Sequence, residues 1–288
     1  MGSGTFTSSS YRSYSKSLGR DYDEDSGRVS GQSFEAHEID ESLDPRKFQI
    51  RECCNSEEHP NTIPVILALD VTGSMGSACA ETAAALGVII TNLYEKFKDI
   101  EFCVMGIGDL AYDDAPIQMS QFESDIRIAE SLDKIYMEMG GGGNGFESYT
   151  AAWYMGLNRT KLDCWKQGRK GIIITMGDEF LNPYLPYKKL NSFVNSSEKK
   201  DIETKELYEL VSKKFYVYHI SVDDKETCYK HYKHECDENW KKLLKENYHV
   251  STIKKLAETI ENCIEISYSP DNVIIESNNV DENGGISW

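Results

Sequence analysis

The chain has 288 residues, and 31 basic against 48 acidic side chains give it a formal net charge of −17 at pH 7. Binding of nucleic acid needs a basic surface, and the short basic clusters at 166–170 and 241–245 are flanked by acids, so we expect no nucleic-acid partner. No apolar run is long enough to span a bilayer. The first residues fit neither a signal peptide nor a myristoylation site, which predicts a soluble, cytoplasmic protein without membrane contact. Eight cysteines in such a chain favour reduced thiols over a disulfide scaffold.

Composition divides the chain into three parts. Residues 1–45 are rich in Ser, Gly and Asp and poor in aliphatic side chains. Such a segment buries too little apolar surface to offset its ordering entropy, so we expect disorder there. Residues 46–268 are expected to form one domain, and residues 269–288 a loose acidic tail.

The predicted domain alternates apolar strands with amphipathic helices. Residues 63–69 (IPVILAL) form a continuous apolar run, which is typical of a strand buried on both faces. The helix that follows places one apolar stripe at Ala83, Leu86, Ile90, Leu93 and Phe97. In chain order, the remaining pattern predicts a strand at 102–107, an edge strand at 117–122, a helix at 128–139, a helix at 151–157, strands at 172–175, 215–222 and 248–251, and a helix at 253–264.

This alternation predicts an α/β protein with a three-layer, Rossmann-like, doubly wound sheet that is mostly parallel and has one antiparallel edge strand. In such sheets ligands bind beyond the carboxyl ends of the strands. Three of the predicted strands end at acids, namely Asp70, Asp109 and Asp178. Because like charges repel, a bound cation would explain why carboxylates gather at this edge.

The loop after the first buried strand reads Asp70-Val71-Thr72-Gly73-Ser74-Met75-Gly76. Its alternate residues all offer oxygen atoms, and oxygen ligands that include hydroxyls suit hard cations such as Mg²⁺, Mn²⁺ or Ca²⁺. The glycines allow the loop to turn tightly. An ordinary helix N-cap is the simpler interpretation, although a cap needs only one such side chain.

The chain resembles the von Willebrand factor A (vWA) family, whose metal-ion-dependent adhesion site (MIDAS) has the pattern Asp-x-Ser/Thr-x-Ser. It is most similar to a group of uncharacterised bacterial and viral proteins with this domain. The resemblance spans about residues 46–265 and rests on Glu58-His59-Pro60, residues 70–76, Gly106-Ile107-Gly108-Asp109, the run GGGGNGFESY at 140–149, Asp163-Cys164-Trp165 and Thr175-Met176-Gly177-Asp178-Glu179.

The resemblance implies a Rossmann-like domain that holds Mg²⁺ at the edge of the sheet. Thr72 and Ser74 would contact the metal directly, whereas Asp70 and Asp178 would act mostly through water. The family usually has a Thr in the second loop, and the matching position here is Glu147, with Ser148 and Asn144 as neighbouring candidates. Glu147 could instead be an acid in the first turn of a helix, where the helix dipole favours it.

The leading functional hypothesis is a binding module in which a protein partner presents an Asp or Glu to the metal. No nucleophile–base pair lies near the loop in sequence, so we do not expect an enzyme. The alternative is a metal-dependent hydrolase or phosphoryl-transfer enzyme in which the sheet-edge acids add catalytic roles: Asp109, Glu147, Asp178 and Glu179. A scaffold with an empty site is a third possibility. The oligomeric state cannot be read from the sequence.

Two further patterns have simple interpretations. Cys228, His231, His234 and Cys236 are the residue types of a zinc site, but a solvated hairpin or helical turn fits their spacing better. The glycines at 140–143 are not followed by Gly-Lys-Ser/Thr, so they predict a flexible turn and not a phosphate-binding loop. Large aromatic side chains are expected to pack in the core, as with Tyr149, Trp153, Trp165 and Trp240.

Overall fold

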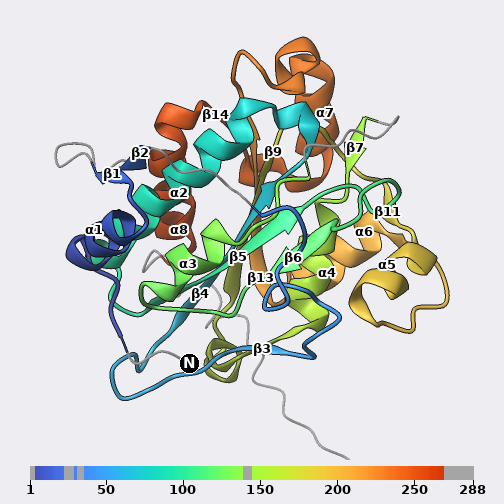
Figure 1. Ribbon diagram of the computed structural model, residues 1–288. Helices are drawn as coiled ribbons and strands as arrows, with labels where there is room; N and C mark the ends of the chain where they lie inside the picture. Colours follow the sequence, from blue (N-terminus) through green and yellow to red (C-terminus); the bar gives the residue numbers. More distant parts are fainter. Residues whose placement is uncertain (1–3, 23–28, 31–35, 139–144, 269–288) are drawn as a thin grey trace, which may run out of the picture.

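A six-stranded sheet runs through the centre of the molecule, with helices on both faces (Figure 1). The computed structural model describes residues 4–22, 29–30, 36–138 and 145–268. The strand order is β14-β13-β9-β4-β5-β6, and all neighbours are parallel except β5 and β6. The strands are β4 (Ile63–Asp70), β5 (Ile100–Ile107), β6 (Ile117–Met119), β9 (Gly171–Gly177), β13 (Phe215–Val222) and β14 (Tyr248–Ser251). This confirms the predicted α/β class and the antiparallel edge strand.

The helices and short strands complete the fold. The helices are α1 (Ser8–Ser17), α2 (Ser77–Lys96), α3 (Arg127–Asp133), α4 (Thr150–Asn158), α5 (Tyr187–Val194), α6 (Thr204–Val211), α7 (Lys233–Leu244) and α8 (Leu256–Ser267). Short strand pairs lie outside the main sheet: β1 (Asp21–Tyr22) with β2 (Val29–Ser30), β3 (Arg51–Cys53) with β8 (Thr160–Leu162), β7 (Phe146–Glu147) with β10 (Phe180–Leu181), and β11 (Tyr184–Leu185) with β12 (Ile202–Glu203).

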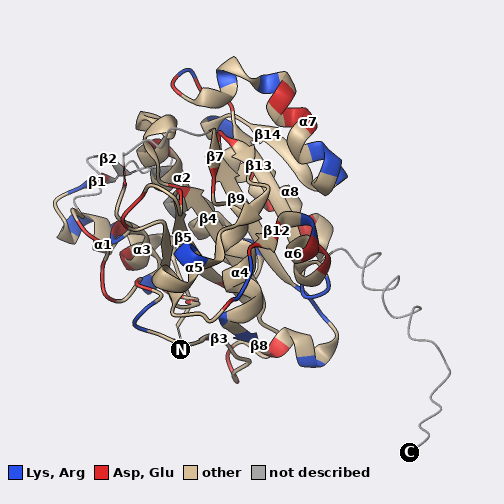
Figure 2. Cartoon of the chain, turned by 90° about the vertical axis from the view of Figure 1, so that its right-hand side faces the viewer, with Lys and Arg blue, Asp and Glu red and all other residues tan. Residues whose placement is uncertain are grey.

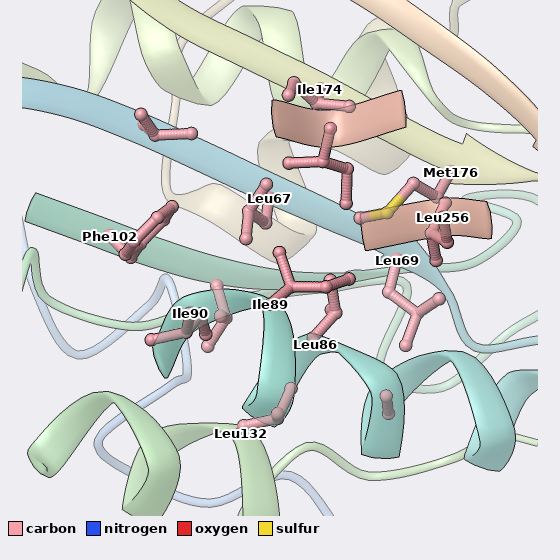
Figure 3. Packing of buried hydrophobic residues seen from close by; sticks show 14 of the residues in the cluster. Leu67, Leu69, Leu86, Ile89, Ile90, Phe102, Leu132, Ile174, Met176 and Leu256 are labelled. Carbon is pink, nitrogen blue, oxygen red and sulfur yellow. The ribbon is translucent and has the colours of Figure 1, made fainter. Parts of the chain in front are cut away.

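Alternation along the strands divides the core into two layers. Leu67 and Leu69 of β4 pack with α2 and α8, whereas Ile66 and Ala68 pack on the side of α4. Figure 3 shows the first layer, in which Leu86, Ile89 and Ile90 of α2 lie against the sheet. In Figure 2 the central strands are almost free of charged residues, which gather on the helices and loops. A strand that is buried on both faces needs a continuous apolar sequence, and such runs therefore predict the central strands.

The second predicted helix is shorter than its pattern. It was expected at 128–139, but α3 ends at Asp133. The side chain of Gln118 bonds to both backbone groups of Tyr136: its Oε1 accepts from the Tyr136 N–H at 2.8 Å, and its Nε2 donates to the Tyr136 carbonyl at 2.8 Å. These bonds replace the helical ones, so the segment leaves the helix beside the edge strand β6.

The edge of the sheet at β6 is covered by the segment that leads into β3. The Met119 N–H donates to the Leu43 carbonyl at 2.9 Å, and Arg51 Nη2 donates to the Met119 carbonyl at 2.8 Å. Leu43 is only 1% exposed, so this segment packs firmly on the sheet. These contacts use backbone groups that an open edge strand would leave without partners.

The expected disorder of residues 1–45 is wrong for much of the described part of that segment. Residues 8–17 form α1, and Thr7 caps the helix in a reciprocal arrangement with Ser10. Phe6 is 2% exposed and Tyr11 3% exposed, so two aromatic anchors supply apolar contact that the average composition conceals. The domain limits at 46 and 268 stay predictions. The predicted tail at 269–288 and the glycine turn at 140–143 lie outside the described residues.

Among the described residues, no helix combines the length and the apolar character that crossing a membrane requires.

Candidate functional site

The first component of the site is the loop that leaves β4 at Asp70, whose side chain is fully buried. Asp70 Oδ1 accepts hydrogen bonds from the backbone N–H of Thr72 at 3.0 Å and from Thr72 Oγ1 at 2.7 Å. The carboxylate therefore folds the loop back on itself. A short 3₁₀ turn over Gly73–Met75 follows, and Gly76 has a φ of 52°, which favours glycine at this turn into α2.

A continuous chain of side-chain oxygens links this loop to the end of β9. Thr72 Oγ1 lies 3.1 Å from Ser74 Oγ, and Ser74 Oγ donates to Asp178 Oδ1 at 2.9 Å. Asp178 Oδ2 accepts from the backbone N–H of Cys228 at 2.6 Å, which fixes its orientation. The structure thus brings together four of the five predicted metal ligands, Asp70, Thr72, Ser74 and Asp178, from two neighbouring parallel strands.

Tyr149 is a residue of this site whose polar role the sequence did not reveal. Its hydroxyl donates to Asp70 Oδ2 at 2.5 Å and accepts from the backbone N–H groups of Asp178 and Glu179, each at 3.2 Å. A Cβ at Gly177 would lie 2.1 Å from this hydroxyl, so glycine is needed there for the close approach. The ring packs in the core as expected, and so do Trp153 and Trp240. A glycine directly before the acid at the end of a strand is the one sequence signal that could have indicated the contact.

Glu147, the fifth predicted ligand, is placed by the pairing of β7 with β10, in which Glu147 lies opposite Leu181. Its side chain is 6% exposed, and its Oε2 has no hydrogen-bond partner among the described residues. Ser148 serves another purpose, since its Oγ accepts from the Leu110 N–H at 3.0 Å and so ties the loop after β5 in place. Asn144 lies outside the described residues. Of Glu147 and Ser148, Glu147 is therefore the better candidate for the metal ligand from the second loop.

Burial gives these carboxyl groups unusual protonation behaviour. Burial and then the charge of Asp178 raise the pKa of Asp70 to about 8. Burial and then the charge of Asp70 raise the pKa of Glu147 to about 11. The pKa of Asp178 is also raised by burial, and burial followed by the charge of Asp178 raises that of Glu179 to about 7. Without a compensating cation, Asp70 and Glu147 are mostly protonated at neutral pH.

Asp109, the third acid predicted at a strand end, is hydrogen-bonded within its own loop. Its Oδ1 accepts from the Ala111 N–H at 2.8 Å, and its own N–H donates to Asp113 Oδ2 at 2.7 Å. Asp109 contributes to the raised pKa of Glu147, so it belongs to the same acidic edge. Its hydrogen bonds to Ala111 and Asp113 shape the loop that follows β5.

The donor set fits a hard cation. In the part of the chain that the structure describes, no three His, Cys, Asp or Glu side chains group together as metal ligands. The oxygen donors at this edge are the hydroxyls of Thr72 and Ser74 and the carboxyl groups of Asp70 and Asp178. Hydroxyl and carboxylate oxygens suit Mg²⁺, Mn²⁺ or Ca²⁺. The buried Glu147 Oε2 without a partner is the observation that favours such an ion, because an unsatisfied buried carboxylate oxygen is costly.

The four residues with zinc-ligand chemistry do not form a group among the described residues. Cys236 is buried, and its Sγ donates to the Glu179 carbonyl at 3.5 Å. The side chain of His234 is 80% exposed and lies 3.8 Å from Glu238. Cys228 and His231 lie in a short 3₁₀ turn and His234 and Cys236 in α7, so the segment is helical and only partly exposed to solvent.

A comparison with protein-family models gives no match, and a comparison with curated proteins gives none either. Among solved structures, the chain is similar to the pilus adhesin SpaC from Lactobacillus rhamnosus GG in two crystal structures, with 13% and 12% identity and a TM-score of 0.48. The alignments cover 74% of this chain and 32% and 31% of the adhesin, so the chain spans about a third of the adhesin's length. It is also similar to the SpRpn10 VWA domain, with 11% identity and a TM-score of 0.41, over 79% of this chain and 100% of that domain. Neither a site nor a partner follows from these likenesses.

Proposed function

We propose that this chain is a metal-dependent protein-binding module of the vWA type, and that the loop at Asp70 forms its MIDAS. The observation that supports this is the oxygen chain from Asp70 through Thr72 and Ser74 to Asp178, with contacts of 2.7, 3.1 and 2.9 Å. A core gains no stability from gathering carboxylates unless something offsets their charge. In the proposal, Mg²⁺ is the resident ion, and Mn²⁺ or Ca²⁺ can replace it.

In this proposal the residues divide their roles by chemistry. Thr72 and Ser74 are the direct ligands, and Asp70 and Asp178 hold the hydroxyls in place and supply negative charge. Glu147 supplies the carboxylate that the second loop directs toward this edge, since its Oε2 has no other described partner. A divalent cation here would neutralise the carboxylates and bind oxygen from outside the domain.

The partner in this proposal is a protein that offers an Asp or Glu side chain to the site. Neutral hydroxyl ligands do not neutralise the charge of the cation, so the cation attracts a carboxylate from the partner. Glu147 would meet part of that charge itself, so we expect metal retention to be stronger and partner capture weaker than in a site with Thr at this position. We further propose a cytoplasmic location, in keeping with the reduced thiols of all eight cysteines.

Calorimetric titration with Mn²⁺ tests the metal site. We expect the native protein to bind one equivalent, and Ser74→Ala to weaken binding by about tenfold or more, because a direct ligand is lost. Ser77→Ala is the matched control: it removes a hydroxyl three residues away that donates to Glu226, and it should bind like the native protein. Circular dichroism establishes that each variant is folded. Absence of Mn²⁺ binding by the native protein, or equal binding by Ser74→Ala, would refute the metal site.

A pull-down with and without chelator tests the partner. Native protein should retain a partner in Mg²⁺ and lose it in chelator, and Asp70→Asn should lose it in both conditions because its charge no longer supports the cation. A partner that stays bound in excess chelator would favour a scaffold whose assembly does not need the site.

A further inference from the structure

A cavity of about 600 Å³ lies far from the acidic edge, where the chain enters β3. Arg46, Lys47 and Gln49 line it from the segment before β3, Arg159 from the end of α4 and Asn195 from the end of α5. β3 and β7 lie at opposite ends of the molecule in Figures 1 and 2, so this cavity is remote from Glu147. Its volume is in the range of small-molecule sites.

Hydrogen bonds join the three segments that form the cavity walls. Arg159 donates through Nη1 to the Gln49 carbonyl at 3.2 Å and through Nη2 to the Val194 carbonyl. Asn195 Nδ2 donates to the Arg46 carbonyl at 3.1 Å. The walls are thus fixed before any ligand arrives, which lowers the entropy cost of binding.

The charge of the lining is the informative feature. None of the lining residues is an Asp or a Glu, and three are cationic. Asp44, which is buried behind the wall, accepts Arg46 Nε at 2.9 and 3.1 Å and offsets one positive charge. Lys47 Nζ lies 3.5 Å from Glu41, whose side chain is 87% exposed, and the charge of Lys47 also helps to lower the pKa of Asp44. Arg159 bonds to neutral carbonyls, so Asp44 offsets only part of the positive charge of the lining.

Two other cavities show that this lining is unusual. The cavity beside β14, of about 390 Å³, has Asp223 and Glu258 against one Lys. The cavity between α6 and α7, of about 380 Å³, mixes Glu209 and Glu246 with lysines. Only the cavity at β3, among these three, is lined by cations without acids, and it belongs to a chain with a net charge of −17.

We propose that the cavity at Arg46, Lys47 and Arg159 binds a phosphomonoester of about the size of a nucleoside monophosphate. A phosphomonoester carries close to two negative charges at neutral pH and so matches the excess charge of the walls. The cavity is larger than the phosphate group alone, and Phe48 and Ile50 in its lining offer apolar contact to the organic part. This site is separate from the proposed MIDAS and needs no metal ion.

Nuclear magnetic resonance titration of the full chain tests the site in buffer free of divalent cations. The probes are adenosine monophosphate, ribose 5-phosphate, inorganic phosphate, citrate and unphosphorylated adenosine. We expect the two phosphomonoesters to shift the amide signals of residues 46–50, 159 and 195, and adenosine to leave them unchanged. Lys47→Glu should weaken phosphomonoester binding by about tenfold or more, since it reverses one of the charges.

Lys254→Glu is the matched control, because it makes the same charge change at an exposed residue outside this cavity and should leave binding unchanged. If Lys47→Glu does not fold, Lys47→Gln takes its place with a smaller expected loss. The proposal is overturned if neither phosphomonoester shifts these signals, if adenosine, citrate or inorganic phosphate binds as tightly, or if the Lys47 and Lys254 variants weaken binding equally. None of these results depends on whether the proposed MIDAS binds metal.

Discussion

At the scale of single residues, Tyr149 joins three parts of the site through one oxygen atom. Its hydroxyl donates to Asp70 at the end of β4 and accepts from the N–H groups of Asp178 and Glu179 after β9. The residue itself begins the approach to α4, so three separate stretches of chain meet at it. A buried hydroxyl with three partners leaves all three unsatisfied when it is removed.

We therefore expect Tyr149→Phe to lower the free energy of unfolding by about 1–3 kcal/mol, since it leaves buried polar groups without partners. Urea denaturation followed by tryptophan fluorescence measures this. Tyr154→Phe is the matched control from the same helix: its hydroxyl donates to Glu198 in a partly buried place, and it should cost less. Equal losses in the two variants would contradict the role assigned to Tyr149.

The site residues differ in how far the sequence could predict their grouping. Asp70, Thr72 and Ser74 lie in one short loop, so their spacing alone predicted that they meet. Asp178 required the further inference that two parallel strands end at the same edge, which the register of β4 with β9 confirms. Tyr149 could not be predicted, because an aromatic side chain in an apolar segment indicates core packing and its hydroxyl partners lie far away in sequence. Whether these residues bind metal stays a prediction.

At the scale of elements, α1 shows how a polar segment can dock by a few contacts. Phe6 stacks on Tyr94 with ring centroids 5.4 Å apart, and its N–H donates to the Ser124 carbonyl at 2.8 Å. Tyr14 and Arg20 both donate to Asp133 Oδ2, at 2.7 and 2.8 Å. The helix thus closes over α2 and α3 although its own sequence is mostly serine.

Replacing the aromatic anchor should release this helix. We expect Phe6→Ala to weaken the docking free energy of α1 by about 3–5 kcal/mol. This loss is enough to separate α1 from the domain while the sheet stays intact. Hydrogen exchange measured by mass spectrometry should show fast exchange over 8–19 in this variant. Lys16→Ala, an exposed change in the same helix, should keep the native protection. Native protection in Phe6→Ala would mean that the polar contacts to Asp133 suffice.

The elements were predicted as well as their apolar patterns allowed. The long strands β4, β5, β9 and β13 are buried on both faces, and a continuous apolar run identifies such strands clearly. Helices α5, α6 and α7 carry many Lys, Glu and Tyr residues, which conceal the apolar pattern that identifies a helix. α1 was missed because mean composition conceals two buried aromatic residues.

At the scale of the whole molecule, the negative charge opposes compactness. The many acidic side chains give a formal charge of −17, and they repel one another. Monovalent salt screens this repulsion in general, whereas a bound divalent ion would remove it at one place.

Thermal unfolding in two salt series separates these effects. Raising NaCl from about 20 to about 300 mM should raise the midpoint gradually, because the screening length shortens. MgCl₂ at matched ionic strength should raise the midpoint temperature further, because an ion that binds only the folded state stabilises that state. Asp178→Asn should respond like the native protein to NaCl but lose the additional effect of MgCl₂. Identical curves at matched ionic strength would argue against specific binding of the cation.

The covering of β6 by the chain at Leu43 has a consequence for how this molecule can associate. With the Met119 N–H and carbonyl already engaged, a visiting strand cannot pair with β6 at this residue. Lateral growth into fibrils, or capture of an extended peptide by backbone pairing, is hindered there. Whatever binds there has to recognise side chains, which makes its selection depend on shape and charge.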